Sequence, residues 1–196
     1  NVKRVVYLST VKVHGDSTSN TPYLAGDELT PSDPYAQSKL EAENLVADIG
    51  TELGVEIVII RPPLVYGPGV GGNFLRLLGM IHKGLPLPFG FVQNLRSLVG
   101  VQNLCDFIRE CLSNSAAPGN RFLVSDNNDV STPELIRLIA SSMSRPARLV
   151  PVPLSMLMLG SRLIGQAAAM SRLIGSLQVD IGASMKALNW TPPVSL

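Results

Sequence analysis

The sequence predicts an α/β protein with a parallel sheet, and three observations lead to this fold class. Val5-Val6-Tyr7-Leu8 is a short run of residues that favour strands. Residues 55–60 are almost entirely apolar and β-branched, which is typical of a parallel strand buried on both faces. Between these two runs, apolar residues recur at helical spacing after Asp33-Pro34. Strand, helix and strand in this order indicate a βαβ unit.

The helix of this unit is predicted to begin at Asp33-Pro34, because proline fits the first turn of a helix. A polar stretch of about 20 residues precedes it, and loops of that length are usually functional or disordered. We expect Glu41 and Glu43 to face water. Four apolar residues at positions i, i+3, i+4 and i+7 are expected to form the inward stripe of the helix: Ala42, Leu45, Val46 and Ile49.

Beyond residue 66 the pattern predicts further helices and short strands. A membrane span needs about 20 uninterrupted apolar residues. Arg162 and Arg172 interrupt 149–178, the most apolar part of the chain, so we expect packed helices there. The elements expected before it are a helix over 73–82, an extended segment over 85–90, a strand over 96–101, a helix from 103, a strand over 121–125 and a helix starting at Ser131-Thr132.

The composition argues against several classes of function. A formal net charge of +1 gives no electrostatic reason to expect a nucleic acid or a membrane as partner. Cys105 and Cys111 are too few for a disulfide framework, and we expect reduced thiols in a cytoplasmic protein. His14 and His82 lie far apart in a sequence without a Cys/His cluster, so we expect no metal site.

Tyr35 and Lys39 are the first candidates for chemistry. They stand four residues apart, so a phenol and an ammonium share one face of the predicted helix. A lysine charge close to a tyrosine favours the phenolate, and the pair therefore predicts a general base. The alternative is a surface pair that arises by chance. Thr10 follows the first strand, at the edge where open α/β sheets bind ligands, but it could also be a strand-end threonine that satisfies a turn.

Thr10, Tyr35 and Lys39 at this spacing resemble the extended short-chain dehydrogenase/reductase family, in particular its nucleotide-sugar epimerases and dehydratases. The segment Arg61-Pro62-Pro63-Leu64-Val65-Tyr66-Gly67-Pro68-Gly69 resembles a second motif of that family, and Leu188-Asn189-Trp190-Thr191-Pro192 resembles its closing segment. The resemblance implies the C-terminal part of a Rossmann-like parallel sheet and a small substrate-binding lobe. It assigns 1–66 to the dinucleotide-binding domain and 67–196 mainly to the lobe, with 97–125 partly returning to the Rossmann domain.

The same resemblance implies an NAD(P)-dependent nucleotide-sugar 4-epimerase, with NAD or NADP as cofactor. Tyr35 would be the base that serves hydride removal and return at C4. Lys39 would also hydrogen-bond the nicotinamide ribose, Thr10 would orient the sugar oxygen, and Pro62 would contribute to the cofactor site. Two alternatives stay open: a nucleotide-4-keto-sugar reductase, and a non-catalytic module that keeps the family fold.

The expected partner is a nucleotide-diphosphate sugar. By position in the family pattern, Arg96 is the first choice for the diphosphate and Arg172 the second, although either could be a surface arginine. Asn73 is expected near the diphosphate. Leu87 and Phe89 are expected beside the nucleotide base, although Phe89 could equally be core.

Three positions depart from the patterns of relatives. Dehydratases of the family follow the catalytic Thr with Asp-Glu, whereas this chain has Val11 and Lys12. Because valine cannot transfer a proton, dehydration by that mechanism is disfavoured. Leu64 stands where many relatives have Asn, which removes a polar contact near the sugar or cofactor.

The glycine-rich turn that opens proteins of this family has no counterpart in the sequence, and the chain begins at about their fifth strand. We therefore expect the 196 residues alone neither to bind dinucleotide measurably nor to turn over sugar. We also expect the uncovered strand edge at 5–8 or 55–60 to pair with another chain or to be covered by rearranged segments, and we expect a homo-oligomer.

Overall fold

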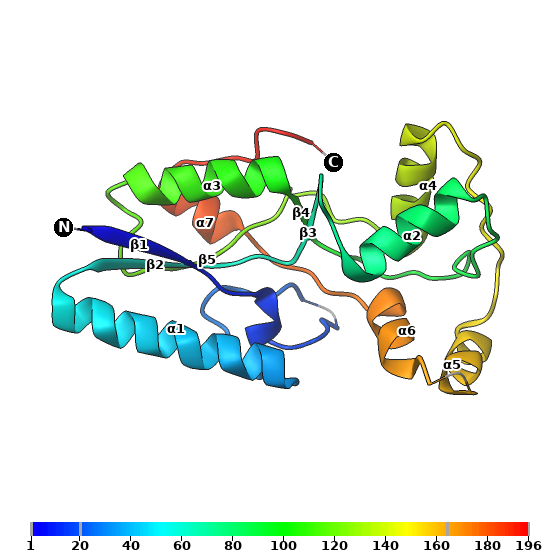
Figure 1. The fold of residues 1–196 in the computed structure, drawn as a ribbon, viewed down its shortest axis with the longest axis horizontal. Coiled ribbons are helices and arrows are strands. Elements are labelled where there is room, and N and C mark those ends of the chain that lie inside the picture. Colours follow the sequence, from blue (N-terminus) through cyan, green and yellow to red (C-terminus); the bar gives the residue numbers. More distant parts are fainter. Residues whose placement is uncertain (1, 20, 164, 196) are drawn as a thin grey trace. The chain divides into compact units, whose positions relative to one another are not determined.

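The computed structural model describes residues 2–19, 21–163 and 165–195, and the chain divides into two units (Figure 1). Unit 1 combines Asn1–Gly67, Ser97–Asn128 and Gln178–Leu196. Unit 2 combines Pro68–Arg96 and Asp129–Leu177. The chain therefore leaves unit 1 and returns to it twice.

A three-stranded parallel sheet forms the centre of unit 1, in the order β1-β2-β5. The strands are β1 (Arg4–Leu8), β2 (Glu56–Arg61) and β5 (Arg121–Leu123). β1 and β2 are parallel neighbours, which confirms the predicted βαβ unit. β2 is buried along its second half, as its apolar sequence predicts. A second, two-stranded parallel sheet joins β3 (Leu64–Tyr66) to β4 (Leu98–Gly100).

Helices cover both faces of the three-stranded sheet, as expected of an α/β fold. Figure 1 shows α1 (Pro34–Leu53) on one face, with α3 (Val101–Ser113) and α7 (Gly182–Leu188) on the other. A short 3-10 helix, η1 (Val11–Val13), follows β1 and contacts α1. This arrangement confirms the α/β class with a Rossmann-like sheet.

The predicted inward stripe of α1 is wrong. Leu45 is 60% exposed and Ile49 is 43% exposed, whereas the buried positions of the helix are Ala36, Glu43 and Gly50. The expectation that Glu43 faces water is therefore also wrong. These positions recur every seven residues, so they share one face. At Gly50 a Cβ atom would collide with the Ile57 side chain, so the helix approaches β2 closely there.

The described residues of unit 2 form the helices α2 (Gly72–His82), α4 (Thr132–Ser142), α5 (Leu154–Leu163) and α6 (Ala167–Ile174). α2 packs on α4 and α5 packs on α6, two pairs that are visible in Figure 1. The predicted start of α4 is confirmed, because Ser131 and Glu134 form a capping box there. Among the residues that the structure describes, no helix has the length and apolar character to cross a membrane.

The last residues of the chain pack onto unit 1, although the sequence assigns them to the lobe. Ser184 donates a hydrogen bond of 2.7 Å to the Leu123 carbonyl at the end of β5. Trp190 packs edge-on against Phe107, with ring centroids 4.7 Å apart, and its indole N–H donates to Asp106 at 2.9 Å. The assignment of the two units to cofactor and substrate binding stays a prediction.

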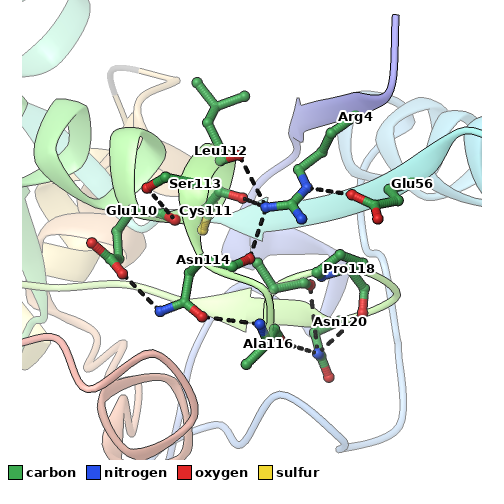
Figure 2. A network of polar contacts seen from close by, with 11 residues as sticks. Arg4, Glu56, Glu110, Cys111, Leu112, Ser113, Asn114, Ala116, Pro118 and Asn120 are labelled. Carbon is green, nitrogen blue, oxygen red and sulfur yellow. Dashed lines mark hydrogen bonds and ion pairs between the residues drawn. The ribbon is translucent and has the colours of Figure 1, made fainter.

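Arg4 joins three elements of unit 1 in a polar network (Figure 2). Its Nε donates to the Glu56 carboxylate at 2.7 Å and so links β1 to the start of β2. Its Nη1 donates to the carbonyls of Cys111, Leu112 and Asn114 at 2.8 to 3.0 Å. These carbonyls lie at the C-terminal end of α3, where the last C=O groups of a helix find no N–H donor within the helix. The positive charge of Arg4 also interacts favourably with the helix dipole at this end.

Replacing Arg4 with Gln should lower the free energy of unfolding by about 2–3 kcal/mol, because charge-assisted hydrogen bonds to the α3 terminus are lost. Chemical denaturation of the purified protein measures this change. Arg109→Gln is the matched control, since Arg109 forms an ion pair with Asp106 on the same helix while its side chain is 79% exposed. The control should change stability by less than about 0.5 kcal/mol. Equal losses in the two variants would contradict the capping role of Arg4.

Candidate active site

The carboxyl end of β1 places Thr10 in a fixed position. Ser9 donates its backbone N–H to the Ile60 carbonyl at 2.8 Å, and Val11 donates to the Pro62 carbonyl at 2.9 Å. These bonds continue the β1–β2 pairing past the end of the strand. Thr10 is buried and caps η1, because its hydroxyl oxygen accepts from the Lys12 backbone N–H at 3.3 Å. That bond uses an acceptor site only, so the hydroxyl hydrogen of Thr10 can donate to a ligand.

Lys39 ties α1 to the same end of β1. Its Nζ donates to the Leu8 carbonyl at 2.9 Å and lies 5.0 Å from the centre of the Tyr7 ring. Tyr35 stands one helical turn earlier on the same face of α1, and its side chain is 53% exposed. The structure therefore brings Lys39 to the strand end that carries Thr10, with Tyr35 one turn away. Their catalytic roles stay predictions.

A buried ion pair next to this site was missed by the sequence analysis. Arg61, the last residue of β2, contacts both carboxylate oxygens of Glu43, with Nη2–Oε2 at 2.6 Å and Nε–Oε1 at 3.0 Å. Their side chains are 1% and 0% exposed. A further bond of 3.2 Å runs from Arg61 to the Ala25 carbonyl. A signal was present in the sequence, because an arginine that closes a buried apolar strand needs a buried carboxylate.

His14 completes this buried cluster. Its Nε2 lies 3.0 Å from Nη1 of Arg61, and its ring stacks on Tyr23 with centroids 5.3 Å apart. Because a guanidinium only donates, Nε2 must accept, which assigns the ring hydrogen of the neutral imidazole to Nδ1. Burial, and then the charge of Arg61, lower the pKa of His14 to about 4, against the opposing influence of Asp27 and Glu43. His14 is therefore neutral at physiological pH.

Lys12 stands where the dehydratases of the resembled family carry a carboxylate, and its ammonium pairs with carboxylates outside the Thr10 site. It forms an ion pair with Asp33, the N-cap of α1, and lies 3.3 Å from Asp16. Val11 beside it is buried. The ammonium of Lys12 is thus held by two carboxylates, and the expectation that dehydration is disfavoured stays a prediction.

The residues predicted to bind the nucleotide part of the substrate lie in unit 2. Asn73 is exposed on the first turn of α2. Leu87 and Phe89 are buried. The backbone of Leu87 also pairs with the segment after α4, through 2.8 Å bonds to Arg148 and Val150. Both side chains thus take part in packing, and their contact with a nucleotide base stays a prediction.

Arg96 already has protein partners in this structure. Its Nη1 donates to the carbonyl of Arg172 and, at 3.1 Å, to that of Gly175, at the end of α6. Burial lowers the pKa of Arg96 from its ordinary value. The side chain of Arg172 is exposed. Arg96 therefore stabilises the end of α6, while diphosphate binding by either arginine stays a prediction.

Within the described part of the chain, no cluster of three or more His, Cys, Asp or Glu residues is arranged to hold a metal ion. Cys105 is exposed, Cys111 is buried, and both are free thiols. Burial raises the pKa of Cys111 to about 12, so its thiol is protonated at neutral pH.

Comparison with known proteins identifies a family and agrees with the α/β fold. Residues 1–125 match the NAD dependent epimerase/dehydratase family. Over 197 residues the chain is 43% identical to a UDP-glucose 4-epimerase of Vibrio cholerae, covering 100% of this chain and 60% of that protein. It is 31% identical over 163 residues to the N-acetyl-alpha-D-glucosaminyl-diphospho-ditrans,octacis-undecaprenol 4-epimerase of Escherichia coli O157:H7, covering 80% of this chain and 48% of that protein.

A solved structure shares the fold. The UDP-glucuronic acid 4-epimerase from Bacillus cereus in complex with NAD matches with a TM-score of 0.76 and 19% identity, over 98% of this chain and 57% of that chain. The chain therefore spans between about half and 60% of the length of these relatives.

Mutation of Glu43 should test the buried ion pair. Glu43→Gln keeps the shape of the side chain but leaves the Arg61 charge uncompensated, and breaking a buried pair in this way costs about 3–5 kcal/mol. Glu41→Gln is the matched control, because Glu41 is exposed two positions away on the same helix. Thermal and chemical denaturation should show a large loss for Glu43→Gln and almost none for Glu41→Gln.

The stability of the protein should fall in acid because of His14. Its pKa is about 6.5 when unfolded and about 4 when folded, so the unfolded chain binds more protons between these values. The contribution of His14 is full above pH 6.5 and declines toward pH 4 by up to about 3 kcal/mol. Unfolding measured between pH 7 and pH 4.5 should show a shallower pH dependence for His14→Gln than for the wild type. His82→Gln, a change at an exposed histidine, should retain the wild-type dependence.

Proposed function

Because the chain belongs to the NAD dependent epimerase/dehydratase family, we propose that the complete protein is an NAD(P)-dependent nucleotide-sugar 4-epimerase. The observation that supports this most directly is the hydrogen bond between Lys39 and the Leu8 carbonyl. It holds the lysine of the Tyr35–Lys39 pair at the strand end that carries Thr10. Lys39 and Thr10 then lie at the strand end where α/β sheets bind their ligands, and the proposed base Tyr35 stands one helical turn away.

The residues at this strand end fit the nicotinamide-ribose part of a dinucleotide. Lys39 has three N–H donors and uses one of them toward Leu8, which leaves donors for ribose hydroxyls. Tyr35 is half exposed beside it, and Pro62 lies at the end of β2. The bound cofactor, NAD or NADP, would supply a hydride acceptor that later returns the hydride.

In this proposal Tyr35 acts on the hydroxyl at C4 of the sugar. The phenolate takes the hydroxyl proton while hydride leaves C4, which yields a 4-keto sugar. Lys39 stabilises the phenolate, and Thr10 donates to the same sugar oxygen and orients it. The keto sugar turns over in the site, hydride returns to its other face, and Tyr35 gives the proton back to the oxygen. The reaction needs no net oxidant or reductant.

Two alternatives use the same residues and are separable by experiment. A 4-keto-sugar reductase would perform the second half only and consume NAD(P)H stoichiometrically. A non-catalytic module would bind UDP-sugar and NAD(H) without chemistry. Incubation of the complete protein with UDP-sugars distinguishes all three, because only the epimerase interconverts sugars without added reductant.

The carrier of the sugar has two candidates. A nucleotide diphosphate is the first, with Asn73, Leu87, Phe89, Arg96 and Arg172 as its proposed contacts in unit 2. An undecaprenyl diphosphate is the second, and the relative from Escherichia coli, whose name states such a substrate, favours it. Turnover of UDP-sugars in the absence of any lipid-linked sugar would select the first.

A cytoplasmic homo-oligomer remains part of the proposal. The free thiols of Cys105 and Cys111 support a reducing compartment. On α1, Leu45 and Leu53 are 60% and 71% exposed on one face, which supports a contact between copies. Sedimentation velocity of the complete protein tests the oligomeric state.

Tyr35→Phe should lower kcat by about 10²–10⁴-fold, because it removes the proposed base. The fold should persist, since the side chain is half exposed, and circular dichroism checks this. Tyr23→Phe serves as the control: it also removes one tyrosine hydroxyl, at a residue hydrogen-bonded to Ser17 rather than on α1, and it should keep turnover. Turnover near the wild-type rate in Tyr35→Phe would exclude Tyr35 as the base.

A further inference from the structure

The outer face of α5 exposes large apolar side chains. Met156, Leu159 and Leu163 are 62%, 61% and 81% exposed, and we call these three residues the α5 stripe. At about 100° per residue they fall within a sector of about 60° on the helix. Leu157 and Ser161, the buried residues of α5, lie on the other side. Large apolar side chains that gather on one exposed face often mark an interaction site, so we expect the stripe to be covered by a binding partner.

The chain segment that contains the stripe is cationic. Arg162 projects about 60° beyond Leu159 on the helix wheel, at the border of the stripe. Arg145 and Arg148 are exposed in the segment that leads from α4 to α5. The sequence between Glu134 and Asp180 contains no acidic residue, whereas it contains five arginines: Arg137, Arg145, Arg148, Arg162 and Arg172.

We propose that α5 binds the surface of an anionic phospholipid bilayer, with the α5 stripe buried at the boundary between headgroups and acyl chains. An interfacial helix combines an apolar face with flanking cations and lies in the plane of the membrane. Each arginine near an anionic surface strengthens binding roughly fivefold. The apolar residues and the arginines of this segment supply the two attractions together, and no acidic residue of the segment opposes them.

A second copy of the chain fits the stripe less well. A two-fold contact places the same surface on both partners. Around the α5 stripe it would bring Arg162 toward the Arg162 of the other copy, without acidic residues in the segment to balance the charge. An anionic lipid surface has the complementary charge instead.

The expectation that the protein has no membrane partner rested on its net charge of +1. That sum averages over the chain and conceals an arginine-rich segment without acidic residues. Peripheral binding also needs no spanning helix, because an interfacial helix inserts on one side only. The proposal is independent of the reaction, since it involves neither Tyr35 nor the sugar.

Vesicle sedimentation of the complete protein tests the proposal. We expect binding to phosphatidylcholine vesicles that contain roughly 30% phosphatidylglycerol, weak binding to pure phosphatidylcholine, and weakening by salt. Met156→Gln/Leu163→Gln should weaken partition at least about tenfold. The matched control is Leu24→Gln/Leu112→Gln, which removes two exposed leucines of unit 1 and should bind as the wild type does.

Arginine variants test the charge component separately. Arg162→Gln, a change on α5 itself, should weaken binding roughly fivefold at low salt. Arg76→Gln, at an exposed arginine of α2, should have no such effect.

A fluorescence measurement gives a second, independent readout. In Met156→Trp, the emission of the new indole should shift to the blue when phosphatidylglycerol vesicles are added. Trp190 is buried in unit 1 and supplies a constant background.

Three outcomes would overturn the proposal. One is the absence of phosphatidylglycerol-dependent binding by the wild type together with an unshifted emission in Met156→Trp. Another is an equal loss of vesicle binding in Met156→Gln/Leu163→Gln and in the control Leu24→Gln/Leu112→Gln. The third is sedimentation velocity in which Met156→Gln/Leu163→Gln dissociates an oligomer while vesicle binding is unchanged, which would identify the stripe as a contact between copies.

Discussion

The buried ion pair between Arg61 and Glu43 is the constraint on which the geometry of unit 1 depends. The two side chains are 1% and 0% exposed, and two carboxylate oxygens meet the guanidinium. Such a pair adds little net stability over an apolar replacement, because desolvation offsets the attraction. The pair instead fixes the orientation of α1, because a buried charge must lie next to its partner. α1 is therefore held in the one rotation about its axis that turns Glu43 toward Arg61 of β2.

That rotation decides where the candidate catalytic groups lie. Lys39 and Tyr35 stand four and eight residues before Glu43, so all three belong to one face of α1. Fixing Glu43 on Arg61 therefore turns Lys39 toward β1, where its ammonium meets the Leu8 carbonyl. A helix packed by apolar contacts alone would tolerate small rotations, whereas two polar anchors on one face exclude them. We infer that the ion pair positions the Tyr35–Lys39 pair.

The sequence predicted the strands of the central sheet, the start of α1 and the candidate trio, because these features depend on local patterns. Val58, Ile59 and Ile60 form a buried apolar run in β2, and Asp33-Pro34 is a strong helix start. The rotation of α1 was not predictable in the same way. Its apolar residues at Leu45 and Ile49 follow helical spacing yet face outward, while Glu43 faces inward. Helical periodicity shows that an apolar face exists, but the charged partner on β2, Arg61, shows which face of α1 is buried.

A second set of polar contacts, made by Asp33, holds the start of α1. These contacts and the Arg61–Glu43 pair lie on either side of Tyr35 and Lys39 along the helix. Asp33 accepts from the Ala36 backbone N–H and also pairs with Lys12 of η1. Lys12 stands two residues after Thr10, so this ion pair connects the threonine segment to the helix turn that carries Tyr35. Where the dehydratases of the resembled family have Asp-Glu after the Thr, this chain has Val11 and Lys12, and Asp33 balances the charge of Lys12. The ion pair of Lys12 with Asp33 therefore links the Thr10 segment to the helix turn of Tyr35, whose role as the base stays a prediction.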